Sequence, residues 1–390
     1  MRPKRKPIRR WTSACLLVLL ATRVAAEPPP PLQPGERPSD GSTEAELWYG
    51  IDRAEKDVRA SPILVRDRQL NAYVRGVVCT VTADYCKDLR VYVVDVPVFN
   101  AQMAPNGAVL VFTGALLRMH DEAELAILLG HEFAHYRDRH GLQYWNKAKH
   151  TSAVFASVGA GGGLAGGIAE MAGSASLSGF ARDVEREADR EGFATAVALG
   201  YDPQAGVRMW SRFLREERAN PASKRSAVFA SHPKTEERLE DVRAAANAVA
   251  ATSAPRNNHD AYRAAIRPFL AHWLDEELSR RTYDSSIQMI EDLREGAPAD
   301  TAGTLAFYLA QAHRQRAHPE DAAIASALYK DAVSHADAPA DAWREYGLDL
   351  RQNGLHADAA NALHRYLAMA PDAADRAFID RYLSDLEKAP

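Results

Sequence analysis

Two histidines and a glutamate occur at the spacing of a metal-binding box in the sequence His-Glu-Phe-Ala-His of residues 131–135. Residues four apart lie on one face of an α-helix, so the imidazoles of His131 and His135 can reach a single zinc ion. Glu132 lies between them and can act as general base towards an attacking water. These residues therefore indicate metal-assisted hydrolysis of a peptide bond. The alternative interpretation is an ordinary core helix that carries two histidines.

A catalytic zinc ion needs three protein ligands and an open position, so a third ligand must lie elsewhere in the chain. Residues 182–189 have the sequence Arg-Asp-Val-Glu-Arg-Glu-Ala-Asp, in which Glu185 and Asp189 are again four apart. Glu185 could bind the metal, and Asp189 could accept the second N–H of a ligand histidine. The alternative is a solvated charged helix face, because arginines alternate with the acids.

Taken together, the two motifs resemble the zinc peptidases related to HtpX and the CAAX prenyl endopeptidase. The resemblance covers about residues 44–250, including the hairpin sequence 100–114 before the active helix and Ser-His-Pro at 231–233 with Arg238. It implies a gluzincin-type zinc peptidase domain, mainly α with a small β-sheet, that binds one Zn2+ ion per chain. The residue roles that it implies are metal ligands His131, His135 and Glu185, the base Glu132, and Asp189 beside the ligands or as proton donor. Ala181 replaces a serine that is common in relatives, with little expected consequence.

The resemblance also draws attention to His232. In periplasmic members of this family that carry tetratricopeptide repeats, a histidine in the matching Ser-His-Pro loop can approach the zinc. A neutral imidazole suits zinc, and Pro233 would stiffen the loop. We therefore expect His232 to act as a gate at the active site. The alternatives are an oxyanion partner and a cap for a helix that starts near Thr235.

The elements expected to position these residues are helices over 44–60 and 67–79, a Val-rich alternating strand over 89–96, and a second strand over 108–112. Pro-Asn-Gly at 105–107 predicts a turn before that second strand. An exposed strand edge next to the active helix could pair with an extended substrate backbone. The alternative is a hairpin that only packs under the helix.

Residues 151–169 contain no charged side chain, and six of them are glycines. The length suggests a membrane span, but large apolar residues are too few for a typical one. We expect a lid or a helical hairpin over the cleft within residues 151–180, because glycines permit close packing and movement.

The start of the chain indicates export. A basic stretch precedes an apolar run and small residues at 24–26, which predicts a signal peptide at 1–26, a mobile Pro-rich leader at 27–43 and a periplasmic location. Uncleaved anchoring is the minor alternative. Cys79 and Cys86 form an even pair in the exported chain, and we expect a disulfide between them.

The complete chain has 48 basic and 52 acidic residues, a net charge of −4, and the signal contributes seven of the basic ones. The exported part therefore has 41 basic and 52 acidic residues and a net charge of −11. An acidic body of this kind is a poor match to nucleic acid, so no nucleic-acid partner is expected. At most peripheral contact with a membrane is expected.

A linker at 251–260 separates the expected peptidase domain, residues 44–250, from an Ala-rich helical region at 261–390. Within that region, Trp343, Gly347, Gly354 and Ala359 have tetratricopeptide spacing, although Tyr366 stands where a small residue is usual. Stacked helix pairs offer a concave face for protein ligands, and the alternative is a helical cap that stabilises the peptidase.

The sequence thus predicts a zinc metalloendopeptidase that acts on exported or envelope proteins. By resemblance, its partners would be protein or peptide substrates, including outer-membrane proteins and their assembly machinery, bound through the repeats. A rival interpretation is a chaperone or assembly adaptor that uses the repeats and cleaves little. A third, a membrane-embedded peptidase for lipid-linked substrates, is disfavoured by the sparse apolar content.

Overall fold

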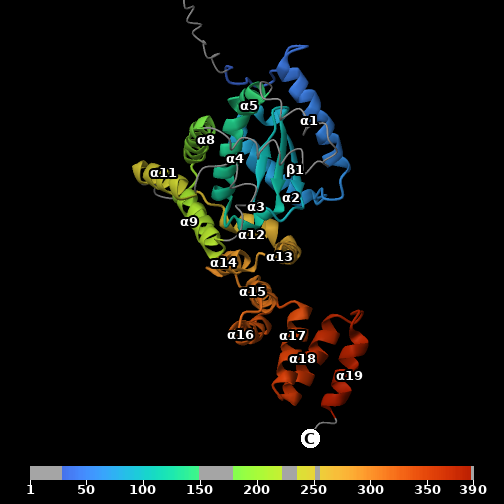
Figure 1. Ribbon diagram of the computed structural model, residues 1–390. Coiled ribbons are helices and arrows are strands. Elements are labelled where there is room, and N and C mark those ends of the chain that lie inside the picture. The colour runs from blue at the N-terminus through green and yellow to red at the C-terminus, as the bar shows by residue number, and fades with distance from the viewer. Residues whose placement is uncertain (1–28, 149–178, 222–234, 251–254, 388–390) are drawn as a thin grey trace, which may run out of the picture.

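A small sheet and one buried helix form the centre of the N-terminal part of the chain (Figure 1). The computed structural model describes residues 29–148, 179–221, 235–250 and 255–387. The described chain is mainly α-helical with a single three-stranded sheet, which confirms the predicted fold class. No helix in these four ranges combines the length and the apolar character that crossing a membrane requires.

The three strands have the spatial order β1-β3-β2, so β3 is central. Strand β1 (Arg90–Val94) runs parallel to β3 (Ala108–Phe112), and the short strand β2 (Ala101–Met103) runs antiparallel to β3. The predicted turn lies between β2 and β3, where Gly107 has φ +86°, and a Cβ there would lie 2.4 Å from the carbonyl oxygen of Asp88. Glycine is therefore required at this turn.

Helices surround this sheet and continue to the C-terminus. The N-terminal part contains α1 (Thr43–Ala60), α2 (Arg68–Thr82), η1 (Ala83–Asp88), α3 (Thr113–Arg118), α4 (Glu122–Arg137), α5 (His140–Ala148), α8 (Gly179–Ala198), α9 (Gln204–Ala219) and α11 (Thr235–Ala248). The C-terminal part contains α12 (His259–Ile266), η3 (Arg267–Phe269), α13 (Leu270–Ser279), α14 (Tyr283–Arg294), α15 (Ala302–Arg316), α16 (Asp321–Val333), α17 (Ala340–Gln352), α18 (His356–Met369) and α19 (Arg376–Leu386).

The Pro-rich segment before α1 differs from the mobile leader that the sequence predicted. Leu32 is only 2% exposed and belongs to the main hydrophobic core. Its N–H donates to the carbonyl oxygen of Arg137 at 2.7 Å, and its own carbonyl accepts from the Tyr85 hydroxyl at 2.7 Å. The described leader residues, from 29 onwards, are therefore fastened to the end of α4. The sequence prediction missed this attachment because Leu32 is a single apolar residue among prolines.

Nearby, Cys79 at the end of α2 and Cys86 in η1 form the predicted disulfide. The disulfide lies in the short segment that connects α2 through η1 to β1.

The region after the expected linker is continuous with the N-terminal core. Tyr262 of α12 and Trp273 of α13 are fully buried in the same hydrophobic cluster as Leu129 of α4. Buried Arg118 bonds to Glu277 of α13 at 3.0 Å and to Glu216 of α9 at 2.7 Å. Helices α12 and α13 thus complete the core of the N-terminal part.

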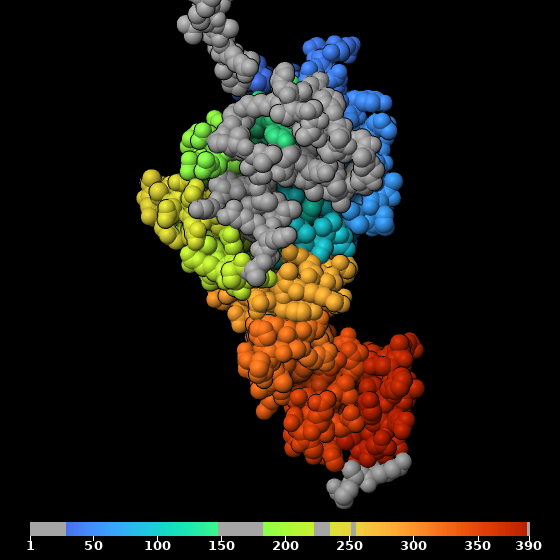
Figure 2. Space-filling model, in the orientation of Figure 1, coloured from blue at the N-terminus to red at the C-terminus, as the bar shows by residue number. Residues whose placement is uncertain are grey.

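Beyond α14 the helices form pairs around two small cores, and α15 also contributes Leu305, Leu309 and Ala312 to the main core. One cluster joins α15, α16 and α17 around Tyr329, and another joins α17, α18 and α19 around Leu363. Figure 2 shows the resulting elongated body, which runs from the blue and green N-terminal part through the orange helices to the red α17–α19. Paired helices agree with the arrangement expected after residue 261, while their identity as tetratricopeptide repeats stays a prediction.

Candidate metal centre

Helix α4 carries the His-Glu-x-x-His box through the centre of the core. Its first turn is capped by Asp121, whose side chain accepts from the N–H of Glu124 at 3.0 Å. Acids in the first turn also suit the positive end of the helix dipole. Almost every residue of α4 is buried, so neighbouring elements hold this helix on all sides. The rigid helix fixes the His131 and His135 imidazoles at a four-residue spacing.

Helix α8 crosses α4 so closely that only glycines fit at the contact. A Cβ on Gly192 would lie 2.4 Å from the backbone nitrogen of His131, and a Cβ on Gly130 would lie 2.8 Å from the carbonyl oxygen of Gly192. Real Cβ atoms essentially never approach a heavy atom that closely. The glycine pair therefore lets the two backbones touch, and this contact brings Glu185 of α8 beside both histidines of α4.

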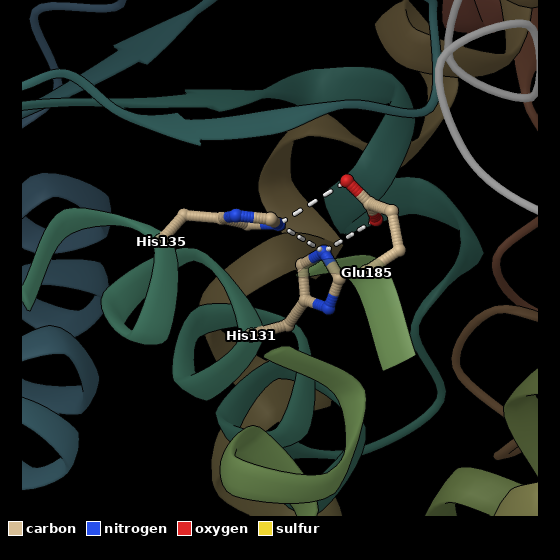
Figure 3. A group of neighbouring side chains, drawn as sticks. All are labelled: His131, His135 and Glu185. Carbon is tan, nitrogen blue, oxygen red and sulfur yellow. Dashed lines mark hydrogen bonds and ion pairs between the residues drawn. The ribbon is translucent and has the colours of Figure 1, made fainter. Parts of the chain in front are cut away.

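The three side chains converge on one point, as Figure 3 shows. The Nε2 atoms of His131 and His135 are 3.1 Å apart. The Glu185 carboxylate approaches His131 Nε2 at 3.5 Å and His135 Nε2 at 3.4 Å. All three ligating atoms lie within 4.8 Å of one another, and His131 and Glu185 are buried. Such a cluster could hold a metal ion, because it combines two imidazoles and a carboxylate with little access to bulk water.

Asp189 lies one turn beyond Glu185 and contacts the far side of His131. Its Oδ1 is 2.9 Å from His131 Nδ1, so the ring nitrogen that faces away from the metal position has an acceptor. Arg238 donates to the same carboxylate through Nε at 2.8 Å, and its guanidinium stacks 3.9 Å from the centre of the Trp210 ring. Asp189 therefore has the geometry of a residue that orients a ligand histidine.

The electrostatics of this pair follow from burial and the local charges. Burial disfavours the imidazolium form of His131, but hydrogen bonds to Asp189 and Glu185 outweigh it and raise the pKa of His131 to about 10. Burial likewise disfavours the carboxylate form of Asp189, but Arg238 and His131 outweigh it and hold the pKa of Asp189 well below its usual range. The raised pKa favours the imidazolium form of His131 when no metal is bound, so a metal ion that binds Nε2 must displace a proton.

Glu132, the expected base, is buried on α4 at 8% exposure. Within the four described ranges its carboxylate makes no hydrogen bond or ion pair with another side chain. Among the described residues, neither oxygen of this carboxylate is a fully buried atom without a partner, so the group remains accessible to a water or a substrate group. The structure thus places Glu132 in the same helix turn as the ligands, as the spacing predicts.

His140 lies beside the centre and was missed by the sequence analysis. Its Nδ1 is 2.9 Å from His135 Nδ1, and the two rings meet edge to face with centroids 5.0 Å apart. Burial, followed by the neighbouring His135, lowers the pKa of His140 to about 4. The available signal was a third histidine five residues after the box, at the start of the next helix.

Two sequence expectations fall outside the described residues. His232, expected as a gate, belongs to the undescribed range 222–234, and the lid expected within 151–180 falls in the undescribed range 149–178 except for its last two residues, which begin α8. Arg238, which the resemblance singled out together with His232, does contact the centre through Asp189.

Comparison with known proteins agrees with this arrangement. Residues 64–246 match the model of Peptidase family M48. The Escherichia coli (strain K12) beta-barrel assembly-enhancing protease is 31% identical over 228 residues, which are 54% of this chain and 46% of the relative. A putative beta-barrel assembly-enhancing protease from Vibrio cholerae is 30% identical over 222 residues, 52% of this chain and 45% of the relative.

A eukaryotic protein is also similar to this chain. The mitochondrial metalloendopeptidase OMA1 of Schizosaccharomyces pombe is 30% identical over 161 residues, 39% of this chain and 45% of the relative. The chain thus spans less than half the length of these curated relatives. The region that matches the family model, residues 64–246, contains the helices α4 and α8 and all three converging side chains. Residues 64–246, just under half of the chain, therefore match the metallopeptidase domain of Peptidase family M48.

Proposed function

We propose that this chain is a zinc-dependent metalloendopeptidase in which His131, His135 and Glu185 hold one zinc ion. The convergence of these three side chains is the observation that carries the proposal. A tetrahedral zinc ion with bonds of about 2.0–2.1 Å keeps its ligand atoms about 3.3–3.4 Å apart. Here the two Nε2 atoms are 3.1 Å apart, and each lies at a similar distance from one oxygen of the Glu185 carboxylate, 3.5 Å from Oε2 for His131 and 3.4 Å from Oε1 for His135. Two histidines and a glutamate are also a known donor set of catalytic zinc.

The residues around the ligands have separate tasks. When bound, zinc would supply a Lewis acid that polarises the scissile carbonyl. Glu132 takes a proton from the water that attacks this carbonyl and returns it to the leaving amine. Asp189 accepts the Nδ1 proton of His131, which fixes the tautomer of that imidazole with Nε2 free. Burial of Glu132 and His131 strengthens these interactions, because the local dielectric constant is low.

Peptide bonds of exported or envelope proteins are the proposed substrates. Strand β2 lies at one edge of the sheet and next to α4. Its outer edge has no partner strand among the residues that the structure describes. A substrate in extended conformation could add to this edge through backbone hydrogen bonds, which would select for unfolded chains more than for a particular sequence.

We further propose that the protein works in the periplasm, in quality control or in the assembly of outer-membrane proteins. Support comes from the signal-like residues 1–26, from the disulfide, which suits an oxidising compartment, and from the names of the beta-barrel assembly-enhancing relatives. The helix pairs after α14 would bind client proteins or the assembly machinery.

The substitution Glu132→Gln tests the catalytic proposal because it keeps the size of the side chain and removes its basicity. We expect the variant to bind one zinc ion and to lose cleavage of casein by at least two orders of magnitude, as removal of a general base typically does. Glu187→Gln is the matched control, because Glu187 lies exposed on α8. A Glu132→Gln protein that cleaves casein at the wild-type rate would disprove the assigned base.

The same variant separates the protease from the adaptor. If cells that lack the wild-type protein tolerate envelope stress equally well with Glu132→Gln, the repeats and not the proteolysis carry the biological role. Loss of this tolerance, with normal protein level, supports the protease.

A further inference from the structure

His135 differs from His131 in what lies behind its ring among the described residues. The Nδ1 of His131 faces the Asp189 carboxylate, whereas the Nδ1 of His135 faces the ring of His140 at 2.9 Å. Zinc bound at His135 Nε2 requires that the single remaining proton of this ring sits on Nδ1. That proton then points at His140 Nδ1, which can only accept it.

We propose, on the basis of the proposed zinc site, that His140 is a positioning residue that fixes the tautomer and orientation of His135. Its own proton must lie on Nε2, so that Nδ1 keeps a free lone pair. Both imidazoles are then neutral, and His135 Nδ1–H donates one hydrogen bond to His140 Nδ1. The outer partner of a zinc-bound histidine is more often a carboxylate or a carbonyl, and an imidazole replaces it here.

The turn between α4 and α5 is built to hold His140 in place. Arg139 adopts a left-handed conformation with φ +53° and forms ion pairs with Glu36 and Glu44. The Arg139 and Glu44 side chains are only 10% and 12% exposed, so this pair is shielded from solvent, whereas Glu36 is 37% exposed. Because a left-handed non-glycine residue is strained, the ion pairs offset a conformational cost.

The following residues fasten α5 on two further sides. Gly141 contacts the hairpin of the sheet, where a Cβ would lie 2.9 Å from Cγ of Pro105. Leu142 packs in a small hydrophobic cluster with Leu47 and Ile51 of α1. His140 itself is 8% exposed and cannot swing freely to solvent. The segment 36–51 therefore braces the partner of the proposed ligand His135, although it lies about 90–100 residues before His140 in the chain.

Zinc affinity of substituted proteins tests this assignment. His140→Leu removes the acceptor, and His140→Asn keeps one, because the asparagine Oδ1 is attached to Cγ as Nδ1 is in histidine. We expect His140→Leu to weaken the zinc Kd by about tenfold or more, in the range known for outer partners. His140→Asn should remain within about threefold of wild type, and its cleavage rate at saturating zinc should exceed that of His140→Leu.

The readout is competition with a chromophoric chelator, and His120→Leu is the control. His120 is a half-buried histidine before α4 that does not contact the centre. If thermal unfolding shows that His140→Leu does not fold, His140→Gln replaces it. The amide oxygen of glutamine lies one carbon further from the backbone than that of asparagine. The zinc Kd of His140→Gln should then be about tenfold weaker than that of His140→Asn. Leu and Asn variants with equal Kd, or a folded His140→Leu with wild-type Kd, would overturn the role of His140. A wild-type protein that binds no zinc would overturn the proposed function instead.

Discussion

Because α4 and α8 are in contact at Gly192, a substitution there should change zinc binding, although glycine has no side chain that could bind the metal. In Gly192→Ala the new Cβ would lie 2.4 Å from the nitrogen and 2.8 Å from the Cα of His131. Both are backbone atoms of a buried helix, so no side chain can rotate to make room. Ordinary van der Waals contact begins at 3.4 Å, and the two helices must therefore separate by about 1 Å.

A displacement of this size is large for a metal site. Metal–ligand distances tolerate only about 0.2 Å, so Glu185 would move about five times further than the site allows. We expect the zinc affinity to fall by about 100-fold, the size of effect that a misplacement of about 1 Å can have at a functional site. Overpacking should also lower the free energy of unfolding by about 1–3 kcal/mol.

Zinc competition titration and thermal unfolding measure the two effects separately. Gly50→Ala is the matched control, because Gly50 lies in the exposed face of α1 and a Cβ added there would have no atom within 4 Å. That change should leave zinc binding intact and stabilise the helix by about 0.5–1 kcal/mol. A Gly192→Ala protein with wild-type zinc affinity would show that the helix contact does not set the position of Glu185.

Three further predictions concern the surroundings of the site. Asp189→Asn removes the charge behind His131 and should weaken zinc binding about 10–100-fold by chelator competition, while an unchanged Kd would remove Asp189 from the site. Zinc association should strengthen as the pH rises towards 10, because the metal-free His131 has a pKa of about 10 and must release its proton; calorimetry in two buffers should find about one proton released at pH 7, and none if the pKa is not raised. Glu277→Gln leaves buried Arg118 with one acid fewer and should destabilise the protein by about 3 kcal/mol in chemical unfolding, and a change below about 0.5 kcal/mol would contradict a structural role for this pair.

The parts of the site that sequence could predict are those with local spacing. His131 and His135 are four residues apart, and so are Glu185 and Asp189, because a helix brings such residues to one face. Strands β1 and β3 and the turn at Gly107 were also predictable, since alternation and turn residues act over a few positions, whereas the three-residue strand β2 was not predicted. The strand limits differ by one or two residues at the ends of β1.

The contacts that complete the site depend on chain segments that are distant in sequence. Gly192 alone suggests only a weak point in a helix, and its purpose becomes visible when α4 lies against it. His140 lies beside His135 only because of the turn at Arg139, whose ion-pair partners come from α1 and the segment before it. The same reason explains the packed leader, because the burial of Leu32 depends on a surface that other helices provide.

The continuity of the core past residue 260 was likewise hidden. The polar residues 255–260 resemble a linker, yet the carbonyl oxygen of Asn257 accepts from the N–H of Glu122, and the Asn258 side chain donates to the Glu122 carboxylate at 2.6 Å. These bonds tie the segment to the first turn of α4. The start of the active helix therefore depends on residues that the sequence assigned to a connection between domains.

X-ray absorption at the zinc edge of the purified, zinc-loaded protein, together with its metal content, tests the central claim most directly. We predict one zinc ion per chain with two imidazole nitrogens and carboxylate oxygen as protein donors, and loss of one oxygen donor in Glu185→Ala. A zinc ion bound by sulfur, or a spectrum that Glu185→Ala leaves unchanged, would contradict the assignment of His131, His135 and Glu185 as the metal ligands.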